Sequence, residues 1–223
     1  GNIVDWRTAN VHVLNHGLHY ASCVFEGERA YNGKIFETEQ HTTRLFKSAE
    51  SLDMNIPFTE SDIIEAKNVL LKKNSLLDAY IRPVVWRGSE MMAVSAQTTK
   101  INVAIAVWEW PSYFDPAQKM QGIKLDIAKW KRPSPECGPV HAKAAGLYMI
   151  CTLSKHEAEA KGYSDALMLD YRGQIAEETE ANIFFKMPGF MQASTGPNAA
   201  SALRSSAPVV SKLLALRSVQ NPS

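Results

Sequence analysis

Hydrophobic and polar positions alternate along the first half of the chain in a way that predicts strands. A period of two predicts a hairpin of Glu28–Tyr31 and Lys34–Phe36, and the intervening Asn32-Gly33 pair is typical of a type I′ turn. Two β-rich runs, Ala79–Trp86 and Ile101–Trp108, are expected to be central strands of a sheet.

Helical periodicity occupies the interval between these strands. It predicts a helix over Glu39–Leu52, which ends before Pro57. Thr59 followed by Asp62 resembles a capping box, with aspartate in place of the usual Glu or Gln, and it would begin a helix that continues through Leu71.

The second half of the chain shows the same mixture of periods. It is predicted to contain a strand at 123–127, a loop at 131–139, a helix at 144–161 that stops at Gly162, a hairpin of 165–169 and 174–176, and a strand at 182–185. From Met187 to Ser223 there is no Asp or Glu, and only a short helix at Val209–Leu216 is indicated.

This order of elements predicts an α+β protein. The expected divisions are a small α/β domain at 1–114, a connector at 115–122, part of a larger domain at 123–186 and an atypical tail at 187–223.

Composition excludes several classes of protein. With 45% hydrophobic and 21% charged residues and a net charge of +1, the chain is typical of a globular protein, and no charge excess suggests a nucleic-acid or membrane partner. No apolar run is long enough to span a membrane, and the residues after Gly1 show no signal-peptide pattern. Three widely spaced cysteines suggest neither a zinc site nor a disulfide framework, so a cytoplasmic location is expected.

Lys143 is the residue with the most specific chemistry. It follows the predicted loop, at the start of the predicted helix, and its neighbours are alanines and a glycine. Small neighbours would let a flat ring approach the backbone, and apolar surroundings favour the neutral amine that Schiff-base chemistry needs. Position alone favours a plainer explanation, a surface lysine in a first helical turn.

Other candidates each have a structural alternative. Glu177 at a strand end is suited to a protonated pyridine nitrogen, but it could belong to a solvated acidic turn. Arg44 is suited to phosphate, but it could lie on a solvated helix face. Tyr80 and Arg82 share one strand face, where the arginine needs a structural carboxylate or a bound acid.

Aromatic and histidine clusters are less specific. Core packing is the default explanation for Trp108, Trp110 and Tyr113. A metal site at His16 and His19 lacks further ligands at a suitable spacing, so no metal is expected.

The order of these motifs resembles that of the branched-chain aminotransferases, class IV enzymes of pyridoxal-phosphate (PLP) fold type IV. The matching segments are 16–27 with 29–31, 41–45, 79–83, 142–148, and 166–185 with its Glu177. The resemblance implies a small α/β domain and a larger barrel-like domain, here incomplete, with an active site between them near a dimer interface.

The resemblance also assigns roles to single residues. It implies that Lys143 is the Schiff-base and proton-shuttle lysine, that Glu177 pairs with the pyridine nitrogen, that Tyr148 bonds the phenolic oxygen, and that Arg44 binds the phosphate. It implies a substrate pocket lined by Tyr20, Phe25, Tyr80, Arg82, Trp110 and Tyr113.

The implied activity is transamination of leucine, isoleucine and valine with 2-oxoglutarate, by a homo-oligomer that is a dimer or larger. D-Amino-acid transaminase and aminodeoxychorismate lyase are alternatives of the same fold. A truncated, non-catalytic remnant is the alternative of another class, because the tail lacks the family's later phosphate-binding loops. The family usually has glycines after the pyridine-binding glutamate, where this chain has Glu178-Thr179-Glu180-Ala181, and the extra negative charge could weaken binding of phosphate or of a substrate carboxylate.

Overall fold

The computed structural model describes residues 1–110, 123–187 and 190–194. These residues fall into two compact units that interleave along the sequence. Unit 1 comprises Gly1–Pro111 together with Pro139–Leu147, and unit 2 comprises Ser112–Gly138 together with Tyr148–Ser223. The stretch that carries Lys143 therefore belongs to unit 1, although it follows part of unit 2 in the sequence.

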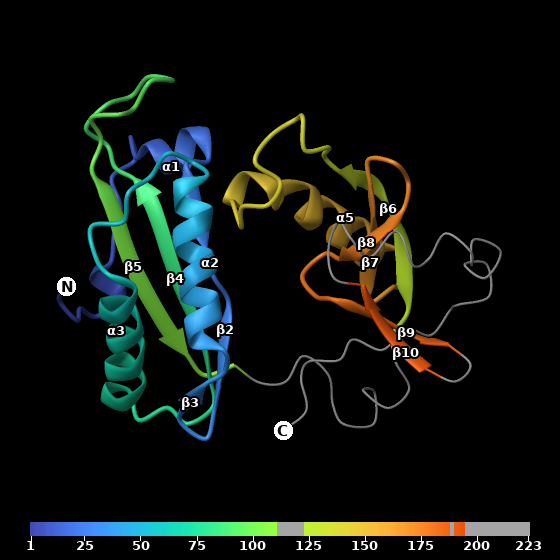
Figure 1. Cartoon of the computed structure of the whole chain (residues 1–223), viewed down its shortest axis with the longest axis horizontal. Coiled ribbons are helices and arrows are strands. Elements are labelled where there is room, and N and C mark those ends of the chain that lie inside the picture. The colour runs from blue at the N-terminus through green and yellow to red at the C-terminus, as the bar shows by residue number, and fades with distance from the viewer. Residues whose placement is uncertain (111–122, 188–189, 195–223) are drawn as a thin grey trace. The chain divides into compact units, whose positions relative to one another are not determined.

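Unit 1 is built on an antiparallel sheet of five strands (Figure 1). They are β1 (Cys23–Phe25), β2 (Glu28–Tyr31), β3 (Lys34–Ile35), β4 (Ala79–Arg87) and β5 (Ile101–Trp108). β4 is central, as expected, because it pairs with β1 and β2 on one side and β5 on the other. The expectation of a central position is wrong for β5, which pairs only with β4 among the described strands. Its residues are half-buried or exposed, as suits an edge strand.

Local turn and cap chemistry sets the boundaries of these elements. Asn32 and Gly33 both have positive φ, 50° and 76°, which the predicted type I′ turn between β2 and β3 requires. The predicted capping box is confirmed, since the Thr59 and Asp62 side chains each bond the other residue's backbone N–H, at 3.2 and 2.8 Å.

Two long helices cover one face of this sheet (Figure 1). The helices of unit 1 are η1 (Trp6–Thr8), α1 (His16–Tyr20), α2 (Thr38–Glu50), α3 (Glu60–Lys73) and η2 (Ala145–Leu147). Leu45 of α2 packs in one buried cluster with Val85, and Leu71 of α3 packs in another with Ile81. Because side chains alternate along a strand, Tyr80 and Arg82 lie on the face away from these helices.

The described residues of unit 2 form a three-stranded sheet, a helix and a separate strand pair. Its elements are β6 (Leu125–Arg132), α5 (Met149–Ala160), β7 (Asp165–Asp170), β8 (Ile175–Glu178), β9 (Ile183–Met187) and β10 (Phe190–Ser194). β6 runs parallel to β7, β7 and β8 form the predicted hairpin, and β9 pairs with β10. Ala158 of α5 is buried against Ala166 and Met168 of β7.

Three expectations about this half need correction. The first strand continues to Arg132, past the predicted start of a loop, because Lys131 and Arg132 remain paired with β7. The predicted helix at 144–161 begins only at Met149, since Ala144 pairs with β1 and 145–147 form a short 3₁₀ turn. β10 was not expected in the acid-free tail. The expected connector, Tyr113 and the short helix at Val209–Leu216 lie outside the described residues.

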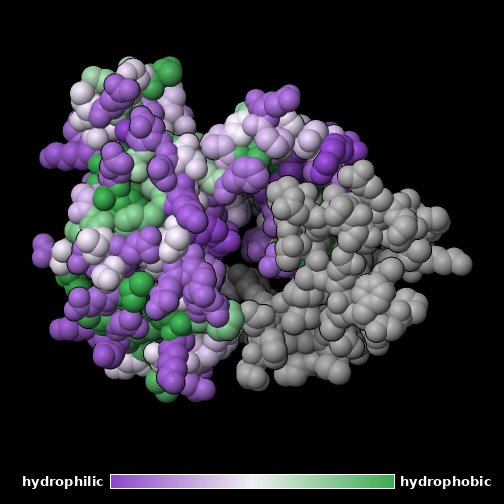
Figure 2. Space-filling model, in the orientation of Figure 1, coloured by the Kyte–Doolittle hydropathy of each residue, from purple (hydrophilic) through white to green (hydrophobic). Residues whose placement is uncertain are grey.

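Hydrophobic residues on the face of unit 1 seen in Figure 2 form separate small groups among hydrophilic ones. Within residues 1–110, 123–187 and 190–194, no helix has the length and apolar character needed to cross a bilayer.

Candidate functional site

Backbone contacts to unit 1 hold the segment that carries Lys143. Its carbonyl accepts the Phe25 N–H at 3.2 Å, and the next residue, Ala144, forms an isolated bridge with Val24 of β1. Its N–H donates to Ser48 Oγ of α2 at 2.9 Å. Lys143 thus lies in a half-buried extended segment, and the alternative of a surface lysine in a first helical turn is wrong.

The side chains of Lys143 and Arg82 both lie against the aromatic ring of Phe25. Lys143 Nζ lies 5.2 Å from the centroid of the Phe25 ring, and Arg82 Cζ lies 4.6 Å from it. Arg82 also donates from Nη2 to Tyr80 Oη at 2.8 Å. Two basic side chains therefore lie against one ring, and one of them is bonded to a phenol, an arrangement that favours an anionic or carbonyl ligand.

Aromatic side chains extend this group along β4 and β5. The Tyr80 ring lies 5.0 Å from that of Trp108 and 5.6 Å from that of Trp110. Arg29 Nη2 donates to the Trp110 carbonyl at 3.2 Å, while its buried Nε and Nη1 have no hydrogen-bond partner among the described residues. Apolar rings beside cationic groups suit a ligand with an apolar part and an acidic part.

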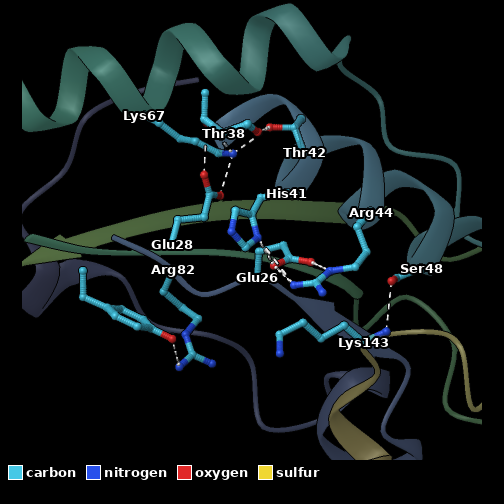
Figure 3. A network of polar contacts seen from close by, with 11 residues as sticks. Glu26, Glu28, Thr38, His41, Thr42, Arg44, Ser48, Lys67, Arg82 and Lys143 are labelled. Carbon is cyan, nitrogen blue, oxygen red and sulfur yellow. Dashed lines mark hydrogen bonds and ion pairs between the residues drawn. The ribbon is translucent and has the colours of Figure 1, made fainter. Parts of the chain in front are cut away.

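Arg44 is held by a buried carboxylate at the edge of this group (Figure 3). Its Nε and Nη2 donate to the two carboxylate oxygens of Glu26 at 2.6 and 2.7 Å, and His41 Nδ1 lies 2.9 Å from Glu26 Oε2. Burial alone would raise the pKa of Glu26, but the hydrogen bonds and charges of Arg44 and His41 outweigh it and lower that pKa to about 2. Glu26 is therefore an ionised group that fixes Arg44 in one orientation, although the Arg44 side chain remains 52% exposed on α2.

A second buried ion pair lies beside the first (Figure 3). Lys67 Nζ of α3 lies 2.6 Å from Glu28 Oε1 of β2, and both side chains are fully buried. Lys67 also donates to Thr42 Oγ1 at 2.7 Å. Burial raises the pKa of Glu28, against the opposing charge of Lys67. This pair ties α2 and α3 to the strand that follows Glu26.

Unit 2 contains the two remaining cofactor candidates within the described residues. Glu177 of β8 forms an ion pair through Oε1 with Arg132 of β6. Tyr148 precedes α5, and its carbonyl accepts the Thr152 N–H at 3.0 Å.

The acidic turn after Glu177 is only partly solvated, since Glu180 is exposed but its two preceding residues are buried. Glu178 and Thr179 are only 2% and 1% exposed, and Thr179 Oγ1 donates to Asp165 Oδ1 at 2.6 Å. Burial raises the pKa of Glu178 to about 8, Asp165 adds to this rise, and Lys155 opposes it. Glu178 thus enters the interior of the unit as a neutral acid near pH 7.

The structure unites some of the predicted site residues and separates others. Lys143, Phe25, Tyr80, Arg82 and Trp110 form one chain of contacts in unit 1. Tyr20 does not belong to that chain within the described residues; it is 46% exposed and stacks on His16, with ring centroids 4.5 Å apart. The default explanation of core packing is incomplete for Trp110, which is half-buried beside Tyr80.

Three residues of this site were missed by sequence reasoning: Glu26, Ser48 and Arg29. Glu26 and Glu28 alternate with Gly27 in a strand-like run, a pattern that places both carboxylates on one face and could have indicated buried acids in need of cations. Nothing local distinguishes Ser48, whose partner Lys143 lies 95 positions away.

His16 and His19, the two histidines considered for a metal site, have structural partners. His16 is 3% exposed, with Nδ1 3.0 Å from Ser22 Oγ and Nε2 2.9 Å from the Ala93 carbonyl. In the described part of the chain, no three His, Cys, Asp or Glu side chains are grouped so that they could hold a metal ion.

Comparisons with known proteins agree with this geometry. The family model described as "Amino-transferase class IV" matches residues 23–190. A probable branched-chain-amino-acid aminotransferase of Rickettsia conorii is 45% identical over 186 residues, which are 83% of this chain and 62% of that protein. The branched-chain-amino-acid aminotransferase of Pseudomonas aeruginosa is 40% identical over 193 residues, 85% of this chain and 63% of the relative.

Solved structures give the same result. The crystal structure of the Escherichia coli branched-chain amino acid aminotransferase superposes with a TM-score of 0.81 at 34% identity, covering 86% of this chain and 64% of that one. The resemblance stated from the sequence motifs is confirmed. The chain spans a little under two thirds of the length of these relatives.

Proposed function

This chain belongs to the class IV aminotransferases, and from that membership we propose that it is a PLP enzyme that transaminates branched-chain L-amino acids with 2-oxoglutarate. The observation that carries the proposal is the placement of the Lys143 ammonium beside the Phe25 ring that Arg82 also contacts. The names of the Rickettsia and Pseudomonas relatives favour this substrate class over D-amino acids or aminodeoxychorismate.

The residues present fit PLP. A fixed guanidinium, such as that of Arg44, suits a phosphate, and a half-buried lysine, such as Lys143, suits an aldehyde. When bound, PLP supplies an aldehyde carbon and an electron-withdrawing ring. We assign the phenolic oxygen to Tyr148 and the ring nitrogen to Glu177, whose carboxylate would keep that nitrogen protonated.

Side chains of the protein would bind the cofactor and the substrate and move the proton. Lys143 Nζ would hold the cofactor covalently and, once displaced by the substrate amine, move the substrate's α-proton. Arg82, bonded to Tyr80, would bind the acidic group of 2-oxoglutarate or glutamate. Phe25, Trp110, Tyr20 and Tyr113 would exclude water around an aliphatic side chain.

An absorbance titration with PLP tests the proposal. We expect a band from bound cofactor that is absent in Lys143→Ala and retained in Lys100→Ala, a matched substitution of an exposed lysine in the same unit. Leucine plus 2-oxoglutarate should then yield glutamate. Turnover of D-alanine, or pyruvate release from aminodeoxychorismate, would shift the assignment within the family, and the absence of any band would favour the non-catalytic remnant.

We further propose a cytoplasmic homo-oligomer, a dimer or larger. Its support is the exposed apolar side chains near the start of unit 1, with Trp6 77%, Val13 68% and Leu18 67% exposed, and the absence of disulfides at Cys23, Cys137 and Cys151. A mass corresponding to one chain in multi-angle light scattering at micromolar concentration would contradict the oligomer.

A further inference from the structure

We propose that Glu26 is a positioning residue, which acts through Arg44 to fix the guanidinium for the phosphate end of the cofactor. The inference rests on the proposed function, in which Arg44 binds that phosphate. Glu26 is a fully buried acid that lies between β1 and β2.

The contact between the two residues is asymmetric. The Glu26 side chain is fully buried, whereas that of Arg44 is 52% exposed. Both carboxylate oxygens of Glu26 are engaged, by Nε and Nη2 of Arg44. A half-exposed arginine would otherwise sample many rotamers, and ordering them would weaken binding of any anion. The buried carboxylate removes that cost before a ligand arrives.

The same helix also fixes the other end of the site. Arg44 and Ser48 are one helical turn apart on α2, and the buried Ser48 Oγ accepts the Lys143 N–H at 2.9 Å. Figure 3 shows the Lys143 side chain extending from this contact, on the Arg44 side of α2. One turn of α2 thus carries a guanidinium suited to phosphate and holds the backbone of the lysine that would hold the aldehyde. Because the two groups of PLP are joined by a rigid ring, a fixed Arg44 is needed for both to fit at once.

Charge and geometry predict opposite effects of removing the Glu26 carboxylate. Glu26 remains ionised at neutral pH, because Arg44 and His41 outweigh its desolvation. Its negative charge disfavours a nearby phosphate through space, so neutralisation alone would strengthen binding. Loss of the contact between Glu26 and Arg44 would instead weaken PLP binding. The direction of the change in Glu26→Gln therefore separates positioning from a purely electrostatic role.

The test titrates the full chain with PLP and with pyridoxal, which has the same ring and aldehyde but no phosphate, and follows absorbance. We expect Glu26→Gln to raise the Kd for PLP about tenfold and to change that for pyridoxal less than about twofold. Glu28→Gln is the matched control, because it is the same substitution at a buried acid of the same segment that pairs with Lys67. It should lower the melting temperature without altering the ratio of the two Kd values.

Arg44→Ala separates this inference from the function on which it rests. If Arg44→Ala leaves the PLP-to-pyridoxal ratio unchanged, or if wild-type chain binds neither aldehyde, the phosphate role of Arg44 fails and the positioning role fails with it. If Arg44→Ala lowers the preference for PLP but Glu26→Gln preserves or increases it, only the positioning role is overturned. In an Arg44→Ala background, Glu26→Gln should have no further effect on the ratio. If Glu26→Gln does not fold, Glu26→Asp replaces it in the test. This substitution keeps the charge and shortens the side chain, and we expect it also to reduce the preference for PLP over pyridoxal.

Discussion

Substituting Lys67 by methionine should destabilise the protein strongly and in a pH-dependent manner. Lys67 and Glu28 are both fully buried, and Nζ lies 2.6 Å from Oε1. Methionine approximates the length of the lysine stem, so little cavity should result, but Glu28 would remain buried without its cation. Removal of one partner of a buried ion pair costs about 3–5 kcal/mol, and we expect a loss in that range near pH 8.

The sign of the pH dependence follows from Glu28. Burial raises its folded-state pKa, and in Lys67→Met the opposing charge is lost, so the folded variant holds a proton on Glu28 at pH values where the unfolded carboxyl is ionised. The group then contributes no penalty below its unfolded pKa of 4.5, and the penalty grows as pH rises above that value. The variant should therefore be closest to wild type near pH 5.

Urea denaturation at pH 5 and pH 8 measures both effects. The double variant Lys67→Met/Glu28→Leu is the control, since replacement of a whole buried pair by apolar residues is often neutral. A loss below about 1 kcal/mol at pH 8, or equal losses at the two pH values, would contradict the claim that this pair is a desolvated ion pair.

Two further predictions concern Glu178 and Gly27. Burial raises the pKa of Glu178 to about 8 from an unfolded value of 4.5, so the stability of the wild type relative to Glu178→Gln should fall as pH rises between those values, by up to about 1.4 kcal/mol per pH unit. Urea denaturation measures this difference, and parallel pH profiles of the two proteins would refute it. A methyl group at residue 27 would overlap the Tyr80 hydroxyl, so Gly27→Ala should lower the free energy of unfolding by about 1–3 kcal/mol. Displacement of Tyr80 should also change the tryptophan fluorescence of the neighbouring Trp108 and Trp110, and an unchanged spectrum would show that Tyr80 is not displaced.

Local chemistry explains which elements could be predicted from the sequence. The Asn32-Gly33 turn and the Thr59 capping box depend on residues a few positions apart, and both were confirmed. The helix expected to begin at Ala144 does not begin there, because Ala144 pairs with Val24, which is distant in the sequence. Periodicity could not reveal that pairing, since it reports only on neighbours in sequence.

The sequence by itself determined the family, the order of most strands and helices, and the identity of Lys143 as the chemically distinctive residue, because motifs and side-chain periods are properties of the chain. Tertiary structure alone decided how that lysine is held, since its contacts come from Phe25 and Ser48, more than ninety positions earlier. It also decided that Glu26 and Glu178 are interior acids and not surface charges. The physical reason is that burial and ion pairing depend on which distant groups exclude water from a carboxylate, and the chain has to fold before those groups meet.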